Sequence, residues 1–162
     1  MTETQKPVIL VAVDESDHSF HALTWALDNF FAPTEDHNFK LIIVHAVVLP
    51  APYRGLVKIG KGSSESLKAV DENLKRSAAS TIQKAKEICS SKSIDDVSTE
   101  VSQGDPRNVL FEAVDKHHAS ILVLGSHGYG AIKRAVLGSV SDYCAHHCPC
   151  NVIIIKNPKP QR

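Results

Sequence analysis

The chain has 162 residues, 43% of them hydrophobic, and its 18 basic residues balance 18 acidic ones, so the formal net charge is zero. This length and composition predict a single folded domain over residues 1–162, and the lack of a basic excess argues against nucleic acid or a membrane surface as a partner. No apolar run is long enough to span a bilayer and the first six residues are too polar for a signal peptide, so we expect a cytoplasmic protein.

Two strands and a helix are predicted at the start of the chain. Val8–Val13 is a continuous apolar run rich in β-branched residues, which indicates a strand covered on both faces, as in a parallel sheet. Ser16 or Asp17 is predicted to cap the helix that follows. Its apolar stripe repeats every three or four residues: Phe20, Leu23, Leu27 and Phe30. A second apolar run over residues 41–48 predicts the next buried strand.

An irregular stretch and a long helix come next. Residues 49–64 are rich in proline and glycine, and a loop of that length beside a ligand site is expected to act as a lid. Residues 66–90 predict a helix with one apolar face, made of Leu67, Val70, Leu74, Ala78, Ile82, Ala85 and Ile88. Residues 97–101 alternate in polarity, which predicts a half-exposed strand at an edge of the sheet.

Two helices and two strands complete the chain. Asp105 followed by Pro106 predicts a capped helix start. Residues 121–124 predict a buried strand, residues 139–147 a last helix, and the run from Val152 to Ile155 a last strand. This alternation predicts an α/β fold with a doubly wound, five-stranded parallel sheet. Two strand orders are common in such sheets, and in both the ligand binds beyond the carboxyl ends of the strands.

The loop between the fourth strand and the last helix carries a functional signal. It reads Gly125-Ser126-His127-Gly128-Tyr129-Gly130 and continues to Gly138-Ser139. Glycines let the backbone approach an anion closely, and the start of a helix adds free N–H groups and a positive dipole end. The loop lacks the G-x-x-x-x-G-K-S/T pattern of a P-loop, and it does not follow the first strand as a dinucleotide fingerprint does. A phosphate cradle and a plain tight turn both fit these glycines.

A cluster of cysteines and histidines lies near the end of the chain: Cys144, His146, His147, Cys148 and Cys150. Three of these residues would share one face of a helix, which raises the hypothesis of a zinc site. The C-x-C spacing is not that of a usual zinc knuckle, however, and a second pair of ligands is lacking. We therefore predict no metal site and expect the cysteines to pack as small apolar residues, with a disulfide between Cys148 and Cys150, or one that links two chains, left open under oxidation.

The spacing Gly125-x2-Gly128-x9-Gly138-Ser139 resembles the nucleotide-binding signature of the universal stress protein family. Three further segments are similar to that family: Val11-Ala12-Val13-Asp14 followed by Ser16, Gly104-Asp105-Pro106, and Leu137-Gly138-Ser139-Val140-Ser141. The segment Cys148-Pro149-Cys150-Asn151-Val152 also resembles it, although Asn151 stands where the family often has proline. The resemblance extends from Pro7 to Lys156 and is strongest to the short, single-domain plant members.

The resemblance implies a three-layer α/β/α fold of the adenine nucleotide alpha hydrolase-like type, with strand order 3-2-1-4-5 and an ordered core over about residues 7–156. It implies ATP or AMP as the ligand, with or without Mg²⁺, and a homodimer formed through the last strand, from Val152 to Ile155. It places these residues around the ligand: Ala12 and Asp14 at the adenine–ribose end, Ala46 at the edge of the base, Leu124 on the base, Gly125 near the ribose, and Gly128, Gly138, Ser139 and Val140 at the phosphates.

These features predict a regulatory protein of the stress response that binds an adenine nucleotide. A slow ATP-hydrolysing enzyme is the first alternative, but it needs a positioned base, a pair of metal-binding carboxylates or an arginine clamp. Asp14 stands alone as a metal ligand, and His127 has no nucleophile or orienting carboxylate near it in sequence, so no catalytic residue is predicted. A redox-dependent holdase chaperone that uses the cysteine cluster is the second alternative.

Overall fold

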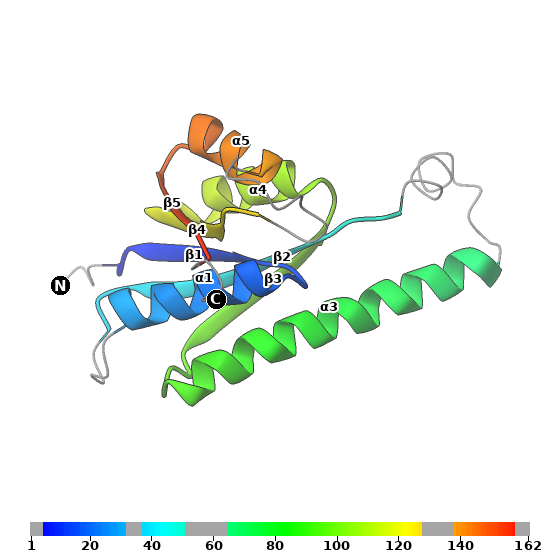
Figure 1. The fold of residues 1–162 in the computed structure, drawn as a ribbon, viewed down its shortest axis with the longest axis horizontal. Helices are drawn as coiled ribbons and strands as arrows, with labels where there is room; N and C mark the ends of the chain where they lie inside the picture. The colour runs from blue at the N-terminus through cyan, green and yellow to red at the C-terminus, as the bar shows by residue number, and fades with distance from the viewer. Residues whose placement is uncertain (1–4, 32–36, 51–64, 128–137, 158–162) are drawn as a thin grey trace, which may run out of the picture.

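The computed structural model describes residues 5–31, 37–50, 65–127 and 138–157 (Figure 1). In chain order its elements are β1 (Val8–Val13), α1 (Asp17–Phe30), β2 (Lys40–Val47), α3 (Glu65–Ser91), β3 (Val97–Gln103), α4 (Pro106–His117), β4 (Ile121–Gly125), α5 (Ser139–His147) and β5 (Asn151–Ile155). The predicted alternation of strands and helices is therefore confirmed. Residues 51–64, most of the predicted lid, lie outside the described residues.

The strands form one parallel sheet in the order β3-β2-β1-β4-β5, which confirms the order that the resemblance implied. Helices α1 and α3 cover one face and α4 and α5 the other (Figure 1). The central strand β1 is the most buried because both faces are covered, and Ile9, Leu10 and Val11 have no exposed surface. Strand β3 lies at an edge, as its alternating polarity predicted.

Local chemistry sets the helix boundaries. Ser16 caps α1, where its Oγ accepts a hydrogen bond from the amide of Ser19 at 3.2 Å. Asp105 caps α4 in the same way through the amide of Arg107 at 2.9 Å, with Pro106 as the first helical residue. Helix α4 ends at His117, and its C-cap His118 adopts the left-handed conformation with φ 49°. The hydrogen bond from the Ser19 amide identifies Ser16, and not Asp17, as the cap of α1.

Helix α3 is buried over only part of its apolar stripe. Ala78, Ile82 and Ala85 are buried against the sheet, whereas Val70 and Leu74, nearer its start, are only half-buried. Figure 1 shows the reason, since the first half of α3 extends past the carboxyl edge of the sheet. None of the helices that the structure describes is long and apolar enough to cross a membrane.

Candidate functional site

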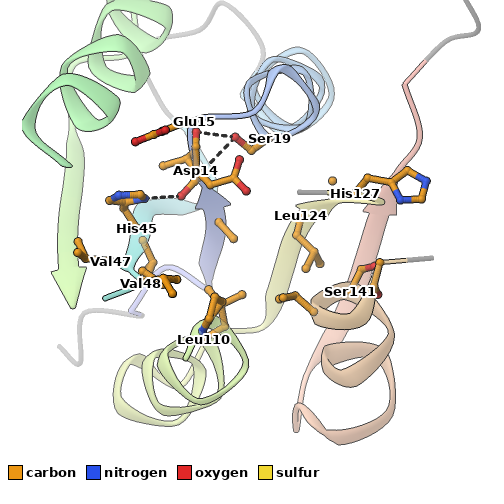
Figure 2. A pocket seen from close by; sticks show the side chains of 18 of the residues that line it. Asp14, Glu15, Ser19, His45, Val47, Val48, Leu110, Leu124, His127 and Ser141 are labelled. Atoms are coloured by element: carbon orange, nitrogen blue, oxygen red, sulfur yellow. Dashed lines mark hydrogen bonds between the residues drawn. The ribbon is translucent and has the colours of Figure 1, made fainter. Parts of the chain in front are cut away.

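A cavity of about 580 Å³ opens at the carboxyl edge of the sheet (Figure 2). Its walls come from the ends of β1, β2 and β4, the starts of α4 and α5, and one side of α3. Strands β1 and β4 are neighbours at the point where the strand order reverses, which is where open α/β sheets bind their ligands. The volume suits a small molecule the size of a nucleotide.

The residues predicted to surround the ligand converge on this cavity. Those that line it are Ala12, Asp14, Ala46, Leu124, Gly125, Gly138, Ser139 and Val140. Gly128 lies outside the described residues. The sequence prediction therefore identified positions from four separate elements that the fold brings to one place.

The turn from β1 into α1 is a dense hydrogen-bond network around Asp14. Its Oδ1 accepts hydrogen bonds from the amide of Ser16 at 2.8 Å and from the Ser16 hydroxyl. The Asp14 amide donates to the Oγ of Ser19 at 3.0 Å. Asp14 thus shapes the helix cap, and its side chain also lines the cavity, so the turn fixes the position of the carboxylate (Figure 2).

The start of α5 forms the opposite end of the cavity. The amide of Asp142 makes the first bond inside the helix, to the Gly138 carbonyl at 3.0 Å. The amides of Ser139 and Val140 precede it and have no acceptor within the helix. Gly138, at the cap position, offers no side-chain acceptor for them. Amides that have no acceptor within the helix, together with the positive end of the helix dipole, make this a favourable place for an anion.

Both described glycines at this end are explained by close backbone packing. A Cβ on Gly138 would lie 2.9 Å from the carbonyl oxygen of Ser126, and one on Gly125 would lie 3.0 Å from that of His18. The absence of a side chain at Gly125 therefore lets α1 pack against the end of β4. The sequence prediction had placed Gly125 only beside the ribose, and nothing in the pattern points to α1 as its neighbour.

The cavity also has walls that the sequence analysis did not identify. Val44, Leu110 and the predicted Leu124 give it an apolar middle, drawn from β2, α4 and β4. His45 is buried beside it, with its Nδ1 2.8 Å from the Val13 carbonyl oxygen (Figure 2). Helix and strand periodicity marks such residues as buried, but it does not separate core from cavity wall.

Helix α3 reaches the cavity through Leu74, Ser77 and Ala78. The Ser77 hydroxyl donates a hydrogen bond to the carboxylate of Glu15, in the turn before α1. Because these two residues are 62 positions apart in the chain, no local pattern could have predicted the contact.

Of His127 and the cysteines, only His127 lines the cavity. His127 is at the cavity margin, packed edge-on against His18 with ring centroids 5.6 Å apart. Figure 2 shows its ring turned toward β5, away from the middle of the cavity. Among the described residues, no group of three or more His, Cys, Asp or Glu side chains is arranged to hold a metal ion. Cys144 is buried, and Cys148 and Cys150 pack against the same core, as expected for small apolar residues.

Comparison with known proteins gives the same family at the level of the domain and of individual relatives. The model of the universal stress protein family matches residues 7–156. The universal stress protein PHOS34 of Arabidopsis thaliana is 29% identical over 91% of this chain, which spans 61% of the length of PHOS34.

Two solved structures share the fold over nearly the whole chain. Universal stress protein UspA from Lactobacillus plantarum is 26% identical, with a TM-score of 0.70 over 94% of this chain and 99% of its own. A universal stress protein in complex with cAMP is also 26% identical, with a TM-score of 0.60 over 92% of this chain and 95% of its own. The fold is thus the adenine nucleotide alpha hydrolase-like one.

Proposed function

Because this chain belongs to the universal stress protein family, we propose that it binds an adenine nucleotide at the carboxyl edge of its sheet and acts as a regulatory protein in a stress response. The observation that carries the proposal is the uncapped first turn of α5 at one end of an apolar cavity. A nucleotide needs both surroundings, since the faces of its base are flat and apolar and its phosphates are anionic.

In this arrangement the adenine lies in the middle of the cavity, between Ala12, Ala46 and Leu124, and the main chain at Ala46 pairs with its edge. The ribose lies between Asp14 and Gly125, where the carboxylate accepts a hydrogen bond from a ribose hydroxyl. The phosphates receive hydrogen bonds from the amides of residues 138–140, from the Ser139 hydroxyl and from the backbone at Gly128.

The cAMP complex of a 26% identical family member supports an adenylate as the ligand class. For this chain we propose AMP or ATP, and Mg²⁺ would accompany the longer phosphate chain of ATP. We propose binding rather than hydrolysis, because the β1–α1 turn does not supply a pair of metal-binding carboxylates: Asp14 is assigned to the ribose, and Glu15 accepts a hydrogen bond from Ser77.

We also propose that the protein is a single-domain cytoplasmic homodimer joined through β5. This strand forms one edge of the sheet, and Val152, Ile153 and Ile154 are only half-buried. An apolar edge strand is a template for further pairing, and a second copy of itself would cover it with twofold symmetry.

Isothermal titration calorimetry tests the nucleotide site. We expect AMP, ATP and cAMP to release heat on binding, and GMP to bind at least about tenfold more weakly because its base presents different hydrogen-bonding groups, a difference of ~1.4 kcal/mol. Failure of every adenylate to bind would overturn the proposal.

Two variants at the exposed Ser139 locate the phosphates. Ser139→Glu puts a negative charge where the proposal places the phosphates, and we expect it to weaken AMP binding about tenfold or more relative to Ser139→Gln, which has the same shape without the charge. An acidic residue in the first turn stabilises a helix, so the weaker binding cannot come from unfolding. If Ser139→Glu and Ser139→Gln bound AMP with equal affinity, the phosphates would not lie at the start of α5.

A further inference from the structure

His45 is a polar residue in an otherwise apolar run. The other residues between positions 41 and 48 are all apolar, and only 6% of the surface of His45 is exposed. A buried imidazole costs free energy unless it is hydrogen-bonded, and an apolar side chain would avoid that cost. The proposed nucleotide contacts use the main chain of Ala46 and not the side chain of His45, so they leave the presence of this histidine unexplained.

The imidazole of His45 is bonded to the end of the neighbouring strand. His45 on β2 is the register partner of Val13, the last residue of β1. Its Nδ1 lies 2.8 Å from the Val13 carbonyl oxygen (Figure 2). Because a carbonyl oxygen can only accept, Nδ1 carries a proton and donates this hydrogen bond. The His45 side chain thus ties the end of β1 to β2.

The same peptide group is held from its other side by α1. The Val13 carbonyl and the Asp14 amide belong to one planar peptide, and in a trans peptide the C=O and N–H bonds point in opposite directions. The Asp14 amide donates a hydrogen bond to the Oγ of Ser19 at 3.0 Å, and Ser19 is buried. Two buried side chains from different elements therefore fix the orientation of the peptide that leads into Asp14 (Figure 2).

We propose that His45 and Ser19 are positioning residues that aim the Asp14 carboxylate at the ribose, and so give the site a preference for a ribose with free hydroxyls. This inference rests on the proposed function, in which Asp14 accepts a hydrogen bond from a ribose hydroxyl. The carboxylate is carried by the Cα that follows the held peptide, so a rotation of this peptide would displace it. Ser16 acts on the side chain instead, because it donates to Oδ1.

The face of the sheet on which His45 lies separates its role from contact with the base. Side chains alternate between the two faces of a strand, so His45 shares the face of Ile43, which packs with the residues of α1 and α3. Ala12 and Ala46, the proposed neighbours of the base, pack on the opposite face with the residues of α4. His45 therefore acts through the Asp14 peptide.

Calorimetry with AMP and with 2′,3′-dideoxy-AMP measures the preference for the ribose. The second ligand lacks both ribose hydroxyls, so the ratio of the two affinities reports their contact with the carboxylate. We expect wild-type protein to bind AMP at least about tenfold more tightly, since hydrogen bonds to charged groups are the stronger ones. In His45→Leu, which lacks the donor, and in Ser19→Ala, which lacks the acceptor, the ratio should fall to about threefold or less.

His45→Asn is the matched control for His45→Leu. The Nδ2 of asparagine is attached to Cγ, as Nδ1 is in histidine, so it can donate to the same carbonyl. We expect this variant to keep the wild-type ratio. Urea unfolding measures the stability of each variant separately. A role in stability alone would lower the affinities for both ligands by the same factor, so it would leave their ratio unchanged.

Several results would overturn the inference while AMP still bound to the wild-type protein, which leaves the proposed function standing. They are equal wild-type affinities for the two ligands, a wild-type ratio in His45→Leu or in Ser19→Ala, and an equal fall of the ratio in His45→Leu and His45→Asn. Ser19→Ala gives the answer even if His45→Leu does not fold. Failure of every adenylate to bind to the wild-type protein would overturn the proposed function and this inference together.

Discussion

The amide of Gly138 donates a 2.7 Å hydrogen bond to the carbonyl oxygen of Ser126, which ties the start of α5 to the end of β4. The Ser141 hydroxyl donates to the same oxygen at 3.2 Å. The Ser126 amide in turn donates to the Ile155 carbonyl at 2.9 Å, so this junction is anchored to β5 as well. The proposed phosphate site is therefore built on the sheet rather than on a loop.

Gly138→Ala is expected to abolish tight nucleotide binding. The new Cβ would lie 2.9 Å from the Ser126 oxygen, so the first turn of α5 must move by a few tenths of an ångström. The backbone at Gly138, with φ −64° and ψ 157°, suits alanine, so the effect comes from this contact and not from strain in the dihedral angles. We expect at least about a tenfold loss of AMP affinity by calorimetry.

Ser141→Ala is the matched control for that variant. It removes hydrogen bonds to the carbonyls of Ser126 and Gly138 but adds no atom. We expect a loss of about 1 kcal/mol in the free energy of unfolding in urea, and a smaller loss of affinity than in Gly138→Ala. Wild-type affinity in Gly138→Ala would show that the position of this turn does not matter for the ligand.

Ser16→Ala is expected to weaken both the fold and the nucleotide site. It removes the cap of α1, which costs about 1 kcal/mol of stability, and it removes the hydroxyl that holds the Asp14 carboxylate. Asp105→Ala removes the cap of α4 with a similar cost, but Asp105 does not line the cavity. We expect a lower affinity for AMP in the first variant only, measured beside urea unfolding. If Ser16→Ala and Asp105→Ala bound AMP with equal affinity, the position of the Asp14 carboxylate would not matter for the ligand.

The strands and helices could be predicted closely because their signals are local. Residues 66–90 were predicted as a helix and Glu65–Ser91 is one, since apolar residues recur there at helical spacing. The second strand ends one residue earlier than predicted, at Val47, and Val48 is 42% exposed beyond it. The order of the strands could not be predicted from local signals, because the alternation of strands and helices fits two orders. Only the family resemblance distinguished between them.

The candidate site was predicted where chain neighbours form it and missed where distant residues do. The glycine loop and Asp14 are visible in sequence because each belongs to one strand–helix turn. The contact of Glu15 with Ser77, and that of Gly125 with His18, join residues far apart in the chain. Such contacts depend on how α1 and α3 pack on the sheet, and periodicity carries no information about that.

Ile153→Lys is expected to turn a dimer into a monomer. Ile153 is a half-buried residue of the edge strand β5, and a lysine in an edge strand opposes pairing with a second strand. Val101→Lys makes the same change on the opposite edge strand, β3, where Val101 is 48% exposed. Sedimentation equilibrium should show a monomer for the first variant and a dimer for the second. A wild-type monomer, or a dimer that only Val101→Lys disrupts, would contradict dimerisation through β5.

The stability of the fold should depend on pH through Glu100. The hydrogen bond from Lys116 is the main cause that lowers the pKa of this β3 carboxyl below its usual 4.5, and contact with His117 adds to it. The folded state thus favours the ionised form, whose contribution is complete above the usual pKa and is lost as the pH falls through the lowered one. Glu100→Gln should be less stable than wild type by up to about 1 kcal/mol at about pH 7, since Lys116 is 65% exposed.

Urea unfolding over a series of decreasing pH values measures that difference, which should shrink toward zero in acid. Glu112→Gln is the control, because Glu112 is an exposed carboxylate on α4, the same helix as Lys116 and His117. Its difference from wild type should stay small at every pH. If the cost of Glu100→Gln were the same in acid as at neutral pH, the carboxylate would act through its shape and not its charge, and the ion pair between β3 and α4 would contribute nothing to stability.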